Sequence, residues 1–246
     1  MPAPRVLWRA LVSLWDESLA FLGANVLWFL CNLPFALVLV LVLVPVATAP
    51  GGADPAAGTA PPLVLAAWLL LFLPTPGSVG LGAVAEVGAG LDAPRTRLLF
   101  WPAVRAHWRP ATVMFVVSLI GTAVLLVNMY FYALSSSPWL RIASILWLYA
   151  LLFWLGMQLY LVPLLLHLPD ARLLDVYRRA ALITLGHPIS TLVLVIAVVI
   201  VGILCVILLP AYFLVAGSLV GLISAHAFRA IRRKLGELPD EEIGAA

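Results

Sequence analysis

The chain has 246 residues, of which 64% are apolar and 10% are charged, and its mean hydropathy is +1.13. A soluble domain usually has about 45–50% apolar and ~25% charged residues, so a water-soluble globule of this composition would expose large apolar patches. These values exclude a soluble enzyme and a free nucleic-acid binder. Together with the segments described below, they predict an all-α, polytopic helical membrane protein with six transmembrane helices and short cytoplasmic amphipathic helices.

Residues 1–18 are predicted to form an amphipathic N-terminus on the cytoplasmic side. Trp8, Leu11 and Trp15 lie on one side of this segment, and we expect that side to face lipid. A cleavable signal peptide is not expected. Two acidic residues precede the first apolar run, and no small-residue cleavage site follows a short apolar region.

A helix that crosses the hydrocarbon core of a bilayer needs about 20 apolar residues. Residues 19–230 contain such segments and form the predicted transmembrane domain. The segments are Leu19–Val44, Leu63–Val87, Ala111–Leu134, Ile142–Leu166 and Ile189–Phe228. The last has no charged side chain, and as one helix it would be about 60 Å long, twice the ~30 Å thickness of the core. We therefore expect two helices there, separated near Pro210, and six spans in all.

The distribution of cations predicts the orientation. With six spans, thirteen of the fourteen Lys and Arg residues lie on the same side as both termini, and only Arg141 lies on the other side. With five spans the division would be nine against five. Cytoplasmic connections of membrane proteins carry an excess of cations, so six spans are favoured. Both termini, including the charged tail 231–246, are predicted to be cytoplasmic.

Two long cytoplasmic connections, residues 92–110 and 170–188, are predicted to contain short amphipathic helices in the membrane interface. Each ends at a proline, Pro110 or Pro188, which we expect to occupy the first position of the next span. The predicted apolar stripe of the second helix is formed by Leu174, Tyr177, Ala181 and Leu185. The arginines predicted to dock a partner or anionic lipid are Arg97, Arg105, Arg109, Arg172, Arg178 and Arg179.

Several segments together resemble the YesL family of bacterial integral membrane proteins. The segments are Asn25–Pro34, Leu73–Gly77, Phe100–Trp108, Arg178–Pro188 and the C-terminal Arg232-Arg233-Lys234. The resemblance extends over roughly residues 10–235. It implies a protein of the bacterial cytoplasmic membrane, in a family with no assigned activity. Genes of that family often lie beside components of carbohydrate-uptake ABC transporters, so the implied partners are permease subunits.

Glu86 is the only acidic residue near the interior of a predicted span. A carboxylate inside the membrane is costly unless it is paired or neutral, which makes Glu86 a candidate functional residue. The alternative is that Glu86 caps the cytoplasmic end of its span. Ser78, Gly82, Glu86 and Gly90 lie on one helix face, and this face would allow another helix to approach Glu86 closely.

Four amide side chains lie inside predicted spans: Asn25, Asn32, Asn128 and Gln158. Hydrogen bonds between helices are their ordinary role, and a polar ligand pathway is the alternative. On the last span, Gly217, Gly221 and Ala225 form a ridge of small residues. We expect this ridge to pack against the fifth span near Gly202, with homodimerisation as the alternative.

No metal site, cofactor site or catalytic constellation is predicted. The four histidines do not share ligand spacing on one helix, and Cys31 and Cys205 lie in separate apolar runs. An intramembrane enzyme is disfavoured because no acid–base pair or activated nucleophile can be assembled. The first functional hypothesis is a non-enzymatic accessory or regulatory protein of solute uptake. The second is a small stand-alone transporter or channel, suggested by the Gly/Pro-rich second span.

Overall fold

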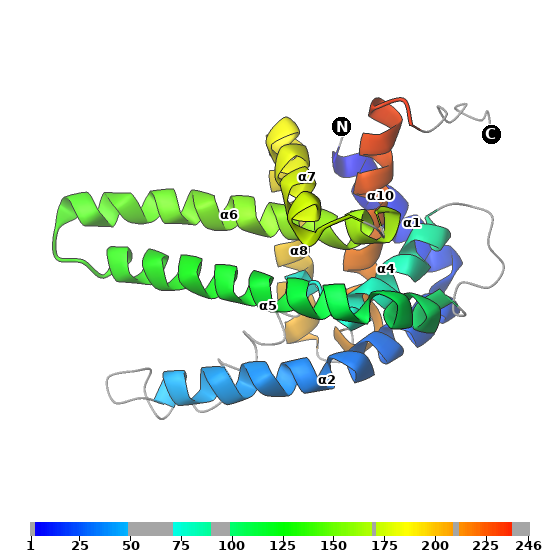
Figure 1. Ribbon diagram of the computed structural model, residues 1–246, viewed down its shortest axis with the longest axis horizontal. Helices are drawn as coiled ribbons and strands as arrows, with labels where there is room; N and C mark the ends of the chain where they lie inside the picture. Colours follow the sequence, from blue (N-terminus) through cyan, green and yellow to red (C-terminus); the bar gives the residue numbers. More distant parts are fainter. Residues whose placement is uncertain (1–2, 49–70, 90–98, 169–170, 209–211, 238–246) are drawn as a thin grey trace.

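A computed structural model describes residues 3–48, 71–89, 99–168, 171–208 and 212–237. Within these residues, helix is the only regular secondary structure (Figure 1). The elements are α1 Ala3–Asp16, α2 Ser18–Thr48, α4 Pro76–Gly88, α5 Phe100–Ala133, α6 Pro138–His167, α7 Leu173–Gly186, α8 Pro188–Ile207, the π-helical turn η3 Tyr212–Ala216, and α10 Gly217–Lys234. The predicted all-α class is confirmed.

Four helices in the described residues are long and apolar enough to cross a membrane: α2 (over Ser18–Val38), α5, α6 and Leu214–Lys234, which is mainly α10. A fifth candidate is the pair α7–α8, which is bent by 104° at its break. The chain is therefore a membrane-embedded helical protein, and the count of six spans stays a prediction. Residues 63–70 of the predicted second span, and the predicted separation near Pro210, lie outside the described residues.

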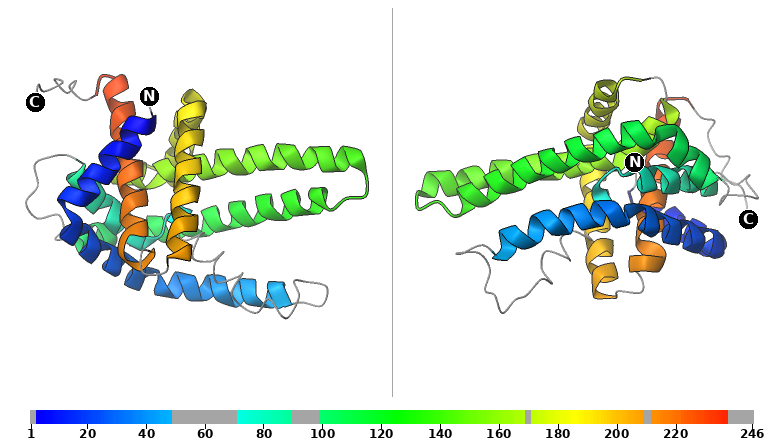
Figure 2. Two further views of the ribbon diagram at one scale, coloured as in Figure 1. Left: turned by 180° about the vertical axis from the view of Figure 1, so that it is seen from behind. Right: turned by 60° about the horizontal axis from the view of Figure 1, so that its bottom comes forward.

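The long helices form two crossing groups. α5 and α6 form an antiparallel hairpin, and α2 runs beside it (Figure 1). α8 and α10 cross this layer at a steep angle, as the views in Figure 2 also show. Away from the crossing, the hairpin exposes apolar side chains such as Ile120, Val124 and Phe131 on α5. Such a surface is suited to lipid and not to water.

Pro110 does not begin a helix, contrary to the prediction for this connection. α5 continues through it from Phe100 to Ala133, so residues 100–109 are not a separate interfacial helix. The reason is tertiary: Phe100 and Ala111, on either side of the proline, are both fully buried, and α4 packs along α5. A Cβ added at Gly80 of α4 would come within 3.0 Å of the Phe100 ring.

The predicted break at Pro188 is confirmed. α7 ends at Gly186 and α8 begins at Pro188. The predicted stripe of α7 is divided in the structure: Tyr177 and Ala181 are part-buried beside the buried Val176, Ala180 and Thr184, whereas Leu174 and Leu185 are exposed, as side chains that face lipid would be. These two leucines lie on the outer side because α6 covers the neighbouring face.

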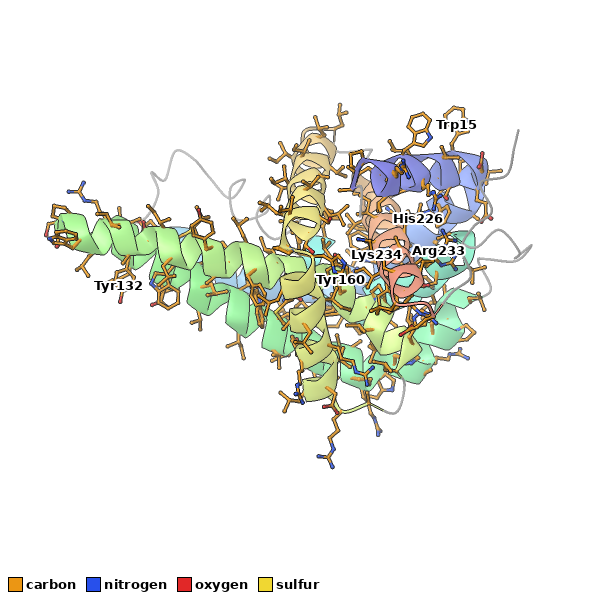
Figure 3. All side chains as sticks on the ribbon, turned by 90° about the horizontal axis from the view of Figure 1, so that it is seen from above. Trp15, Tyr132, Tyr160, His226, Arg233 and Lys234 are labelled. Atoms are coloured by element: carbon orange, nitrogen blue, oxygen red, sulfur yellow. The ribbon has the colours of Figure 1, made fainter. Side chains whose placement is uncertain are left out.

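α1 lies against α10 and, to a smaller extent, α8. Its buried residues are Ala3, Val6 and Ala10. Trp8, Leu11 and Trp15 are exposed, as predicted, and Figure 3 shows Trp15 pointing away from the helices. The N-terminal helix is therefore a packed part of the fold that presents one aromatic side outward.

Candidate functional site

A cavity of about 50 Å³ lies where α2, α4, α6 and α10 meet. Its polar lining residues are Ser78, Glu86, Gln158 and Ser224, and Trp28 contributes an aromatic wall. A water molecule needs roughly 10–15 Å³ of such volume, so the cavity has room for a few waters. Buried drug-sized ligands occupy pockets of about 300–1,000 Å³, which is far larger.

The N-terminus of α4 brings Ser78 to this cavity. Thr75 is the N-cap of α4, and its hydroxyl oxygen accepts a hydrogen bond from the backbone N–H of Ser78 at 3.0 Å. Such a cap satisfies one of the backbone donors left open at a helix start. Trp28 of α2 donates from Nε1 to Ser78 Oγ at 3.2 Å. The polar network therefore joins α2 to the first turn of α4.

Close approach of α6 to α4 depends on Gly82. A Cβ at Gly82 would lie 2.5 Å from Cγ1 of Val162 on α6. The predicted small-residue face of this segment is thus used, and α6 is the helix that it admits. Residue Gly90, the last member of the predicted face, lies outside the described residues.

Glu86 lines the cavity and pairs with Arg229 of α10. Arg229 Nε lies 3.7 Å from Glu86 Oε2, and Arg229 Nη2 donates a hydrogen bond to the backbone oxygen of Glu86. The exposed fractions of the Arg229 and Glu86 side chains are 24% and 13%. Oε1 of Glu86 is buried and has no hydrogen-bond partner among the described residues. One oxygen of the carboxylate therefore has the Arg229 cation beside it, and the other has no hydrogen-bond donor among the described residues.

Gln158 lines the same cavity from α6 and also links three helices. Its Oε1 accepts a hydrogen bond from Ser118 of α5 at 2.9 Å. Ser118 Oγ lies 2.9 Å from the Tyr177 hydroxyl of α7, which also donates to Met114 O at 3.1 Å. Gln158 Nε2 is buried and has no hydrogen-bond partner in the described part of the chain. Glu86 and Gln158 therefore both line the cavity, and each has one buried polar atom without a hydrogen-bond partner among the described residues.

The three asparagines do not converge on this cavity. Asn25 of α2 accepts a hydrogen bond at Oδ1 from the backbone N–H of Ser218 at 2.8 Å, which ties α2 to α10. Asn32 is buried and donates to the Trp28 carbonyl of its own helix at 2.9 Å. Asn128 likewise donates within its own helix, to Val124 O at 2.8 Å. Of the amides, only Gln158 shares the cavity with Glu86.

The ridge on α10 packs against α2 and α4. The prediction that it packs against the fifth span is wrong. A Cβ at Gly217 would lie 2.7 Å from Asn25 Oδ1, and one at Gly221 would lie 3.5 Å from Ala85 Cβ. Ala225 is buried and lines the cavity with both glycines. A ridge of small residues lets another helix approach closely. On α10 that helix is α4, and not α8 with its Gly202, as predicted.

The predicted docking arginines lie apart from the cavity. Arg105 and Arg109 are exposed on the first turns of α5. Exposed positions at the start and middle of α7 hold the remaining described members, Arg172, Arg178 and Arg179. Arg97 lies outside the described residues. In the part of the chain that the structure describes, no group of three or more His, Cys, Asp or Glu side chains is placed to hold a metal ion.

Two partners of the site were missed in the sequence. Arg229 was counted only as an orienting cation, although it lies 143 positions from Glu86 and compensates its charge. Tyr177 was assigned to an apolar stripe, although its hydroxyl joins the Ser118–Gln158 network. Helical periodicity identifies residues on one face but contains no signal for the helix that will cover that face.

Comparisons with protein-family models, with curated proteins and with solved structures found no match. The class of this protein is therefore defined by its fold and composition: a membrane-embedded, all-helical protein with a small polar cavity among α2, α4, α6 and α10. Membership of the YesL-like family stays a prediction.

Proposed function

We propose that this chain is a non-enzymatic protein of the bacterial cytoplasmic membrane that assists or regulates a solute-uptake system, with carbohydrate as the solute class. The single observation that supports an accessory role is that the polar cavity is small and that its polar side chains bond helices to one another. It measures about 50 Å³, and Gln158 and Trp28 on its wall are hydrogen-bonded across helices. Such a site ties helices together and leaves little room for a sugar. The carbohydrate link follows from the YesL-like resemblance.

The proposed docking element is α7, on the cytoplasmic side in the six-span arrangement. Leu174 and Leu185 are 78% and 63% exposed, and the exposed Arg178 lies one turn after Leu174. Tyr177 attaches this helix to α5 through Ser118. An amphipathic helix held against the fold with apolar and basic side chains outward is suited to a groove on a partner protein.

Capture of partners from native membranes tests this proposal. The full chain carries an affinity tag, is extracted in mild detergent, and its bound proteins are identified by mass spectrometry. We expect permease or ATPase subunits in stoichiometric amounts. Charge reversal on α7, Arg178→Glu, should reduce their recovery, whereas the matched reversal Arg5→Glu on α1 should not. Recovery of the protein without transporter subunits from membranes that contain them would contradict the proposal.

A second candidate function is a small stand-alone transporter. Two observations favour it. Glu86 and Gln158 line one cavity and each has a buried atom without a hydrogen-bond partner among the described residues. The chain is also non-helical at Pro74, directly before α4. Discontinuous helices often line transport sites. In proteoliposomes, this function requires solute flux that Glu86→Gln and Gln158→Ala abolish, while Asn128→Ala, away from the cavity, leaves it unchanged. Absence of flux for every small solute tested with the wild-type protein would contradict this function.

A further inference from the structure

A second hollow, the α6–α7–α10 groove, follows the polar cavity along α6 and α10: Pro163 lines the cavity and Leu164 lines the groove. It has a volume of about 330 Å³ and opens to the surface. Its walls are mainly apolar and include Leu164 of α6, Leu182 and Ile183 of α7, and Phe228 and Ile231 of α10. The groove is therefore large enough for part of an acyl chain, in contrast to the 50 Å³ cavity.

The rim of the α6–α7–α10 groove is basic. Arg179 of α7 and Arg232 of α10 approach it from different helices. Among the described lining residues, Glu237 is the only carboxylate, and it pairs with Arg232 at 2.9 Å while 52% of its own side chain stays exposed. His167 forms part of the wall, where its ring lies 5.0 Å from that of Phe228 and its Nδ1 lies 2.9 Å from Pro163 O. In the described part of the lining, two arginines therefore stand against one carboxylate.

The place of the α6–α7–α10 groove in the fold agrees with its chemistry. The groove is formed by the C-terminal ends of α6 and α10 and by the middle of α7. Arg233 and Lys234 lie at the end of α10 (Figure 3). In the six-span arrangement all these parts lie at the cytoplasmic border. At that border, lipid phosphates lie directly above the acyl chains, and basic pockets between helices bind anionic headgroups.

We propose that the α6–α7–α10 groove binds an anionic phospholipid. The phosphate lies between Arg179 and Arg232, and one acyl chain follows the apolar wall formed by Leu182, Phe228 and Ile231. The two ends of the molecule match the two parts of the groove, since cations lie at the rim and apolar side chains lie below. A zwitterionic lipid offers the same chains but no net negative charge to the two arginines.

Native mass spectrometry of the full chain tests this site. The protein in neutral detergent is titrated with phosphatidylglycerol and phosphatidylcholine of identical acyl chains, and the bound lipid is quantified. We expect preferential binding of phosphatidylglycerol. From ~1 kcal/mol per cation near a membrane surface, Arg179→Gln and Arg232→Gln should each weaken that binding about fivefold, and the double variant about thirtyfold. The matched loss of two exposed charges outside the groove, Arg5→Gln with Arg141→Gln, should leave the preference intact.

Two further measurements complete the test. Glycerol 3-phosphate should not displace the lipid at equal concentration, because it lacks the acyl chain, and Leu182→Asn should weaken lipid binding while the melting temperature stays unchanged. Displacement by glycerol phosphate, equal binding of both lipids, or an unaltered preference in the Arg179/Arg232 double variant would each overturn the proposal. Occupation of the groove by a permease chain, with the lipid absent, would also overturn it.

Discussion

At the scale of single residues, the polar side chains of this membrane protein are placed in pairs that limit the cost of burial. Glu86 has Arg229 at 3.7 Å, and Asn25 accepts the backbone N–H of Ser218. A charge or amide inside a bilayer is costly unless it finds such a partner. The pairs join helices that are far apart in the chain, so they also select which helices meet.

The Glu86–Arg229 pair predicts an asymmetric effect of mutation. Replacing Arg229 by Met leaves the Glu86 carboxylate largely buried beside a cavity without its partner, and we expect a loss of about 1–3 kcal/mol in the free energy of unfolding. The double variant Glu86→Gln with Arg229→Met should regain much of that loss. Unfolding by a denaturing detergent, followed by circular dichroism, measures both. Equal stability of the Arg229 variant and the wild type would show that the pair contributes nothing.

Gly217 and Gly221 form a matched pair for testing helix contact. A Cβ at Gly217 would lie 2.7 Å from Asn25 Oδ1 and 2.9 Å from Trp28 Cδ2, and Asn25 cannot move without breaking its hydrogen bond to Ser218. We expect Gly217→Ala to destabilise the protein by about 1–3 kcal/mol through overpacking.

At Gly221 the nearest atom to an added Cβ would be 3.5 Å away, which is an ordinary contact. Gly221→Ala should therefore be tolerated. Thermal unfolding of both variants in one detergent measures the difference. Two equally stable variants would contradict the packing of Gly217 against α2.

At the scale of elements, α7 depends on contacts with α5 and α6 for its position. The Tyr177 hydroxyl reaches Ser118 and Met114, and its ring stacks on Trp154 with 6.0 Å between centroids. Three of the six other large apolar side chains of this helix, Leu174, Leu182 and Leu185, are exposed. A 14-residue helix of this kind is marginal by itself, so tertiary contacts must hold it.

Tyr177→Ala should release α7. We expect faster amide hydrogen exchange across Leu173–Gly186, while exchange in α6 changes little. Tyr177→Phe keeps the stacking and removes the hydroxyl, so it should cost about 0.5–1.5 kcal/mol. Leu174→Ala is the control, since that side chain is 78% exposed. Unchanged exchange in the Tyr177→Ala variant would show that other contacts hold the helix.

The two prolines differ because of their surroundings. Pro188 begins α8 after a break, as a proline at the first helical position should. Pro110 has the same local sequence signal, but the helix passes through it, and Phe100 and Ala111 on either side of it are both buried in a helix that α4 contacts. The local pattern was therefore sufficient at one proline and insufficient at the other.

At the scale of the whole molecule, the arrangement is a layer of α2, α5 and α6 crossed by α8 and α10 (Figures 1 and 2). The small polar cavity lies where members of both groups meet α4. Candidate docking surfaces lie elsewhere, on α7 and along the α6–α7–α10 groove. The interior cavity and the outer groove differ in volume, about 50 Å³ against about 330 Å³, and the proposed accessory role uses the outer surfaces.

The number of spans can be tested by thiol labelling in intact cells. In a variant with Cys31 and Cys205 replaced by Ala, Ser136→Cys lies between α5 and α6, and Leu235→Cys follows α10. The six-span arrangement predicts that a membrane-impermeant reagent labels position 136 at once and position 235 only after permeabilisation. Labelling of both positions in intact cells would indicate five crossings.

By itself the sequence determined the class of protein and most of its helices. Composition decides whether a chain folds in a bilayer or in water, and a run of about 20 apolar residues predicts a helix that crosses the bilayer. Only the tertiary structure decided that Asn25 meets Ser218 across 193 positions, that Arg229 compensates Glu86, and that the α10 ridge packs on α4. The reason is physical: periodicity assigns residues to a helix face, whereas packing among all the helices selects the partner of that face.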